Sequence, residues 1–108
     1  DPEAVKIQIP AKLTKATTEK IRTLSIQAFN ALRCNDFARV DLFLTGTKVY
    51  VNEINTIPGF TNSSMYPMMW KERGISFTDL ITRLIDIALT RFEENKRIER
   101  SFQSNLKF

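Results

Sequence analysis

The chain has 108 residues, 43% hydrophobic and 26% charged, and carries 16 Lys and Arg against 12 Asp and Glu for a formal net charge of +4. These values predict one globular domain and exclude a wholly disordered chain. No apolar run approaches the roughly 18 residues of a membrane-spanning helix, so we expect no membrane partner.

The residue types that are absent or rare exclude several kinds of catalytic and metal site. The sequence has no histidine, which excludes Ser-His-Asp catalysis, histidine-bound zinc and histidine pH switches within these residues. Its single cysteine, Cys34, excludes an internal disulfide and fits a reducing compartment, so we expect the cytoplasm. The positive charge forms no basic cluster, so we expect no nucleic-acid partner. The chain opens at Asp1 without a signal-peptide pattern, and we expect it to be part of a longer protein.

The first predicted elements are a short strand, a helix and a hairpin. Alternation over Lys6–Ile9 predicts a strand that stops at Pro10. Apolar residues at helical spacing predict a helix over about 14–33. Two β-branched and aliphatic runs on either side of Gly46 predict an antiparallel hairpin over about 37–55.

Two helices are predicted after the hairpin. The first covers about 65–72. Ser76 opens the second, with Asp79 at the third position after this capping residue. A broad apolar face predicts a helix over about 77–95, and we expect the polar segment 93–108 to be a helical tail. The fold class is therefore α+β, with the hairpin packed against the helices.

The register of the hairpin decides which side chains share a face. A three-residue loop, Gly46–Lys48, places Arg39 opposite Asn55 and Asp41 opposite Glu53. Directly opposed residues point to the same face, so these four polar side chains would lie together. A slip by one residue would separate the two carboxylates. The chosen register gathers apolar residues on the reverse face: Val40, Leu42, Leu44 and Ile54.

Two carboxylates that face each other repel unless a cation neutralises them. Oxygen donors of this kind suit Mg²⁺, which commonly bridges to substrate phosphates. Spacing alone leaves a second interpretation open, in which a solvent-facing hairpin carries an ordinary Arg39–Asp41 ion pair.

Segment 56–64 is a predicted loop that leaves this polar face. Gly59 allows the backbone to approach a ligand closely. The loop leads into a predicted helix start near Ser64, where free N–H groups suit an anion. A plain Pro58–Gly59 turn accounts for the same composition, so the loop alone does not establish a site.

Three segments together resemble the C-terminal part of the D-alanine–D-alanine ligases, a family of the ATP-grasp superfamily. They read Ala-Arg-Val-Asp at 38–41, Asn-Glu-Ile-Asn-Thr-Ile-Pro-Gly-Phe-Thr at 52–61 and Ser-Met-Tyr-Pro at 64–67. These motifs occur in the family's order and close to its spacing, within a likeness that extends from about Lys6 to Leu89.

The resemblance implies a metal and phosphate site on the hairpin. Asp41, Glu53 and Asn55 would hold the Mg²⁺ (or Mn²⁺) ions that bridge the phosphates of ATP, the co-substrate. Arg39 would stabilise the charge that develops on the transferred phosphoryl group. Phe43 would contact the adenine, although an aromatic residue on a strand is more often part of a core.

The resemblance also implies a substrate site in the following loop. The Gly59 N–H would form part of an oxyanion hole for the tetrahedral intermediate. Ser64 and the Met65 backbone would hold the carboxylate of the second, attacking substrate.

The implied function is an ATP-dependent ligase that makes D-alanyl-D-alanine, or a D-serine or D-lactate variant, for the peptidoglycan precursor through a D-alanyl phosphate. Residues 1–108 would form the C-terminal half of an ATP-grasp domain, inactive alone, with 1–5 as the end of a mobile loop. The resemblance also implies a homodimer. Two alternatives stay open: another ATP-grasp carboxylate–amine ligase, and a non-enzymatic α+β module that binds a protein partner.

Overall fold

The computed structural model describes residues 6–105, in which helices and strands form one α+β arrangement. The elements are α1 (Lys15–Ala31), β1 (Arg39–Thr45), β2 (Lys48–Asn55), α2 (Met65–Glu72) and α3 (Phe77–Asn105). β1 and β2 pair as a two-stranded antiparallel sheet. The predicted fold class is therefore confirmed, whereas the expectation for residues 1–5 lies outside the described part of the chain.

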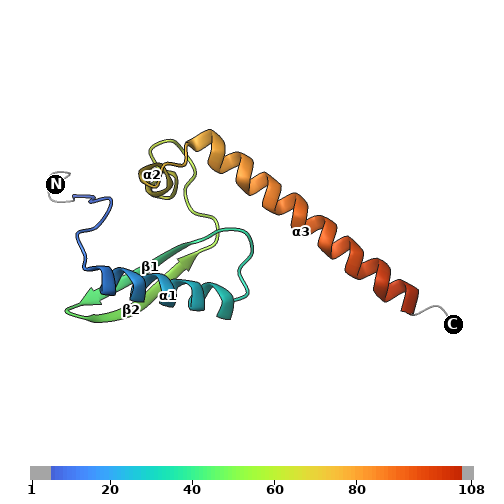
Figure 1. The fold of residues 1–108 in the computed structure, drawn as a ribbon, viewed down its shortest axis with the longest axis horizontal. Coiled ribbons are helices and arrows are strands. Elements are labelled where there is room, and N and C mark those ends of the chain that lie inside the picture. Colours follow the sequence, from blue (N-terminus) through green and yellow to red (C-terminus); the bar gives the residue numbers. More distant parts are fainter. Residues whose placement is uncertain (1–5, 106–108) are drawn as a thin grey trace.

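The elements form an elongated molecule, because α3 projects away from the rest (Figure 1). α1 packs against the hairpin, and α2 lies next to the start of α3. The principal extents are 66, 32 and 27 Å. None of the helices within residues 6–105 combines the length and apolar character needed to cross a bilayer.

α1 begins and ends close to the predicted positions. Thr14 caps it, since its hydroxyl accepts a hydrogen bond from the Thr17 N–H at 3.1 Å. The Lys20 ammonium donates to the Thr47 carbonyl at 3.0 Å, which ties the helix to the turn of the hairpin. α1 thus packs against one face of the hairpin.

The strand predicted at Lys6–Ile9 is wrong. This segment has no regular secondary structure, and Ile7 is 61% exposed. A strand needs a partner for its backbone hydrogen bonds, and in the described residues β1 and β2 pair only with each other. Alternation in the sequence indicated which side chains could face inward, but it carried no information about a pairing partner.

α3 continues past the predicted boundary at about 95 to Asn105, so the tail expected over 93–108 is helical as far as the structure describes it. Its start matches the prediction, because the Ser76 hydroxyl accepts the Asp79 N–H at 3.1 Å. Polar helix-forming residues continue the helix after Phe92, with Glu93 placed four residues before Arg97 for a favourable side-chain pair.

An aromatic cluster joins the loop after β2 to both C-terminal helices. The ring of Phe60 lies 6.1 Å from Phe37, 5.8 Å from Tyr66 and 5.5 Å from Phe77 between centroids. Tyr66 and Leu80 are the most buried hydrophobic residues, at 7% and 4% exposed. This small core fixes where loop 56–64 lies relative to β1 and α2.

Candidate functional site

The hairpin pairs the predicted site residues as expected. Arg39 is opposite Asn55 and Asp41 is opposite Glu53. Opposed residues of an antiparallel pair share a face, so the two carboxylates lie on one side of the sheet. The predicted pairing of these four residues is therefore confirmed.

The turn that produces this register differs from the prediction. Thr45 pairs with Lys48, so the loop holds two residues, Gly46 and Thr47, and Gly46 supplies the positive φ of 62° that such a tight turn needs. The pairing then shifts between Asp41 and Leu42.

This shift is a β-bulge at Asn52, and it restores the predicted register. Leu42 pairs with Val51 while Asp41 pairs with Glu53, which leaves Asn52 as the extra residue of β2. Without the bulge, the two-residue turn would place Asn52 opposite Asp41. Glu53 would then point to the opposite face. The bulge therefore decides that the two carboxylates face each other.

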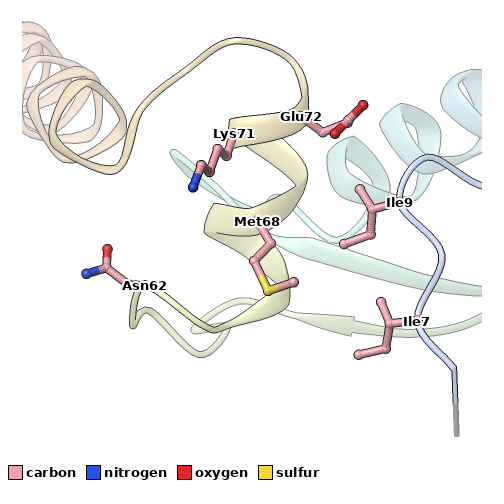
Figure 2. A pocket seen from close by; sticks show the side chains of 6 residues that line it. All are labelled: Ile7, Ile9, Asn62, Met68, Lys71 and Glu72. Carbon is pink, nitrogen blue, oxygen red and sulfur yellow. The ribbon is translucent and has the colours of Figure 1, made fainter.

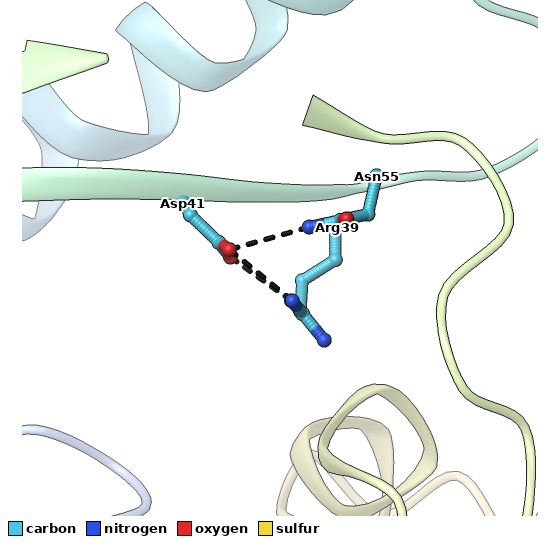
Figure 3. Close-up of polar contacts among 3 residues, drawn as sticks. All are labelled: Arg39, Asp41 and Asn55. Atoms are coloured by element: carbon cyan, nitrogen blue, oxygen red, sulfur yellow. Dashed lines mark hydrogen bonds and ion pairs between the residues drawn. The ribbon is translucent and has the colours of Figure 1, made fainter. Parts of the chain in front are cut away.

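Asp41 is the centre of the polar cluster. Arg39 donates to both of its carboxylate oxygens, from Nε at 2.9 Å and from Nη2 at 3.1 Å, and Asn55 Nδ2 donates to Oδ2 at 3.2 Å. The side chains project to the side of β1 away from α1 (Figure 3). Arg39 and Asp41 are partly buried, with 22% and 31% of their side-chain surfaces exposed.

These contacts set the charge state of the cluster. The Arg39 hydrogen bond lowers the pKa of Asp41 despite partial desolvation, and the hydrogen bond from Asn55 lowers it further. The same bond raises the pKa of Arg39. Asp41 is therefore an anion at neutral pH, paired with the Arg39 guanidinium at 2.9 Å.

The donor set on this face fits Mg²⁺. The described residues contain no cluster of three or more His, Cys, Asp or Glu side chains that could hold a metal ion by itself. Asp41, Glu53 and Asn55 offer two carboxylates and an amide, which are hard oxygen donors. Because Asn55 donates from Nδ2, its Oδ1 is the atom left to accept a ligand bond. Such a partial set suits an ion whose other ligands are phosphate and water oxygens.

Loop 56–64 brings Gly59 next to Ser64. A Cβ atom built on Gly59 would lie 3.2 Å from Ser64 Oγ, so a larger residue would press on that hydroxyl. Ser64 occupies the position before α2, but its side chain makes no capping bond to the helix. It accepts instead from the Thr61 N–H at 3.0 Å. Met65, the first residue of α2, is 39% exposed.

Phe43 lies on the same face as Asp41, because residues two apart on a strand point the same way. It pairs with Tyr50 and is 59% exposed. The more common core role for a strand aromatic is therefore wrong here, while contact with an adenine stays a prediction.

Two residues of this region have structural roles that were not predicted from the sequence. Thr61 bonds to Ser64, and its signals were its place among other hydroxyl residues and at the end of the ligase-like segment 52–61. Asn52 forms the bulge, and the break in the apolar alternation of β2 is the signal that could have found it.

A separate hollow of about 610 Å³ lies between the N-terminal segment and α2 (Figure 2). Its lining consists of Ile7, Ile9, Asn62, Met68, Lys71 and Glu72. None of the predicted site residues is among them, so this hollow is distinct from the polar face of the hairpin.

Comparison with known proteins places these features in a family. A family model described as "D-ala D-ala ligase C-terminus" matches residues 1–86. The chain is 56% identical over 93 residues to the D-alanine–D-alanine ligase of Acetivibrio thermocellus, covering 83% of this chain and 24% of that protein. It is 46% identical over 102 residues to the D-alanine–D-alanine ligase of Shouchella clausii, covering 94% of this chain and 28% of that protein.

Solved structures agree with these relatives. The D-alanine–D-alanine ligase of Coxiella burnetii matches with a TM-score of 0.85 at 43% identity, over 88% of this chain and 28% of that one. The Bacillus anthracis enzyme complexed with ATP matches with a TM-score of 0.78 at 30% identity, over 82% of this chain and 31% of that one. This chain thus spans about a quarter of the length of the curated relatives above.

Proposed function

We propose, because this chain belongs to the D-alanine–D-alanine ligase family, that it forms the C-terminal part of an enzyme that joins two D-alanine molecules at the expense of ATP. D-Serine or D-lactate in place of the second D-alanine belongs to the same proposal. The named relatives favour this function over a non-enzymatic module. We further propose a homodimer in the cytoplasm.

The observation that carries the proposal is the hairpin face on which Arg39, Asp41, Glu53 and Asn55 converge. Asp41, Glu53 and Asn55 would hold Mg²⁺ or Mn²⁺, which would neutralise phosphate charge. A guanidinium has five N–H groups, and those of Arg39 that do not bond to Asp41 remain for the transferred phosphoryl group. This division of donors lets one arginine both position a metal ligand and stabilise developing negative charge.

The proposed reaction has two steps. A carboxylate oxygen of the first D-alanine attacks the γ-phosphorus of ATP, so that ADP leaves and a D-alanyl phosphate forms. The amine of the second D-alanine then attacks the carbonyl carbon, phosphate leaves, and the nitrogen loses a proton to give the dipeptide. The Gly59 N–H would donate to the oxyanion of the tetrahedral intermediate. Ser64 and the backbone of Met65 would hold the carboxylate of the attacking substrate.

Phosphate release by the full-length protein with ATP, Mg²⁺ and D-alanine tests the proposal. Glu53→Gln keeps the shape of the side chain but removes the charge that a metal needs, so we expect kcat to fall about a hundredfold or more with an unchanged melting temperature. Glu72→Gln, an exposed acid on α2 away from this face, is the matched control and should retain activity.

Two results would count against the proposal. Undiminished turnover in Glu53→Gln would show that Glu53 does not hold a catalytic metal ion. Phosphate release that needs a different carboxylate and amine, with none for D-alanine, would favour another ATP-grasp carboxylate–amine ligase.

A further inference from the structure

Thr61 contacts the Ser64 hydroxyl through two of its own groups. Its N–H donates to Ser64 Oγ at 3.0 Å, and the two hydroxyl oxygens lie 2.8 Å apart. The latter distance is typical of a good O–H···O hydrogen bond. Thr61 is exposed and Ser64 partly buried, so the bonds tie a surface residue to the hydroxyl beside Gly59.

These bonds determine whether the Ser64 hydroxyl can still donate a hydrogen bond to a ligand. A serine hydroxyl has one proton to donate and two lone pairs. The Thr61 N–H occupies one lone pair. If Ser64 donated its proton to the Thr61 hydroxyl, it would have none for a ligand. If Thr61 donates instead, both lone pairs of Ser64 are occupied and its proton remains for a ligand.

A carboxylate only accepts hydrogen bonds, so it can pair with Ser64 in the second arrangement alone. We propose that Thr61 is a positioning residue that holds the Ser64 hydroxyl as a donor toward the carboxylate of the attacking substrate. This inference rests on the proposed function, since it assumes that Ser64 binds that carboxylate. Donation from Thr61 to Ser64 and on to an anion also strengthens each bond in the series.

Thr61→Val in the full-length enzyme is the direct test, because it removes the hydroxyl while keeping the side-chain shape and the backbone N–H. We expect the KM of the attacking D-amino acid, fitted separately from that of the first, to rise about five- to tenfold. The KM of ATP and kcat at saturating substrate should stay within about twofold. Thr61→Ser, which keeps the hydroxyl, should restore the wild-type KM.

Ser63→Ala is the matched control. Ser63 lies in the same turn with its hydroxyl 3.4 Å from that of Thr61, which is longer than a typical O–H···O hydrogen bond. We expect its kinetics to stay within about twofold of the wild type. Thr61→Ala, which removes the same hydroxyl, carries the same prediction as Thr61→Val if the valine variant does not fold.

A double-mutant cycle tests whether Thr61 acts through Ser64. In a Ser64→Ala background, Thr61→Val should raise the substrate KM by less than about twofold further. An equal effect in both backgrounds would overturn the inference, as would an unchanged KM in Thr61→Val. A joint loss of kcat and ATP affinity would also overturn it, because Thr61 would then only hold the loop. By contrast, a wild-type enzyme without ligase activity would refute the proposed function itself.

Discussion

Gly59 has little room for a side chain beside Ser64. Its backbone is outside the left-handed region, so an alanine there is not strained in φ and acts only through its Cβ, 3.2 Å from Ser64 Oγ. We expect Gly59→Ala to push the Ser64 hydroxyl aside by a few tenths of an ångström and to lower kcat/KM for the attacking substrate about tenfold. Steady-state kinetics beside a thermal melt measure this.

The same variant separates a functional glycine from a glycine that only makes a turn. A Pro-Gly turn without a site would tolerate the alanine, and kinetics equal to those of the wild type would support that simpler explanation. We expect the melt to be unchanged, because Gly59 is exposed and no buried contact is lost.

At the scale of single elements, the sequence predicted well what depends on local periodicity. The helix at Lys15–Ala31 lies where apolar spacing placed it, and the helix at Met65–Glu72 has its predicted bounds. Pairing is a property of two segments, so the alternation at Lys6–Ile9 suggested a strand that has no partner in the described residues.

The hairpin shows how a correct register came from an incorrect turn. Apolar residues of β1 recur two apart, at Val40 and Leu42, whereas those of β2 step by two and then by three, from Val49 through Val51 to Ile54. The longer step is the extra residue of the bulge. The apolar pattern near the site predicted the correct pairs there. Because it did not reveal the bulge, the predicted turn was one residue too long.

Residue spacing alone did not predict the roles of the site residues. Opposed acidic residues are compatible with a metal site and with an ordinary ion pair, and the Arg39–Asp41 bond that the second interpretation predicts is present. Only a ligand or a measured activity distinguishes the two interpretations, since both place the same side chains together.

A long-range ion pair adds to the contacts that place α3. Arg91 donates to both carboxylate oxygens of Asp36, at 3.0 and 2.9 Å, and so joins the middle of α3 to the segment before β1. Because Arg91 is half exposed, solvent screening limits the pair to about 0.5–1 kcal/mol.

We therefore expect Arg91→Ala to speed amide hydrogen exchange around residues 33–38 and along α3 about two- to fivefold in the full-length protein. Arg97→Ala, on the exposed end of the same helix, is the control and should leave exchange at residues 33–38 unchanged. Equal exchange in the wild type and Arg91→Ala would show that the aromatic cluster around Phe60 holds α3 without the ion pair.

At the scale of the whole molecule, the described chain buries little for its length. The radius of gyration is 18.2 Å, compared with about 13 Å for a compact domain of about 100 residues. Large side chains of α3 remain open to solvent, with Leu89, Phe92 and Ile98 at 59%, 62% and 66% exposed. So much exposed apolar surface is unusual for an independent soluble domain.

This low burial predicts weak cooperativity when residues 1–108 are produced by themselves. We expect a broad urea transition with a shallow slope, because the slope scales with the surface that unfolding exposes, together with binding of a hydrophobic dye. Replacing Phe92 and Ile98 by glutamine should reduce dye binding, since both side chains are exposed on α3. One steep transition without dye binding would contradict the prediction, because it would require a compact core that residues 6–105 do not contain in this arrangement.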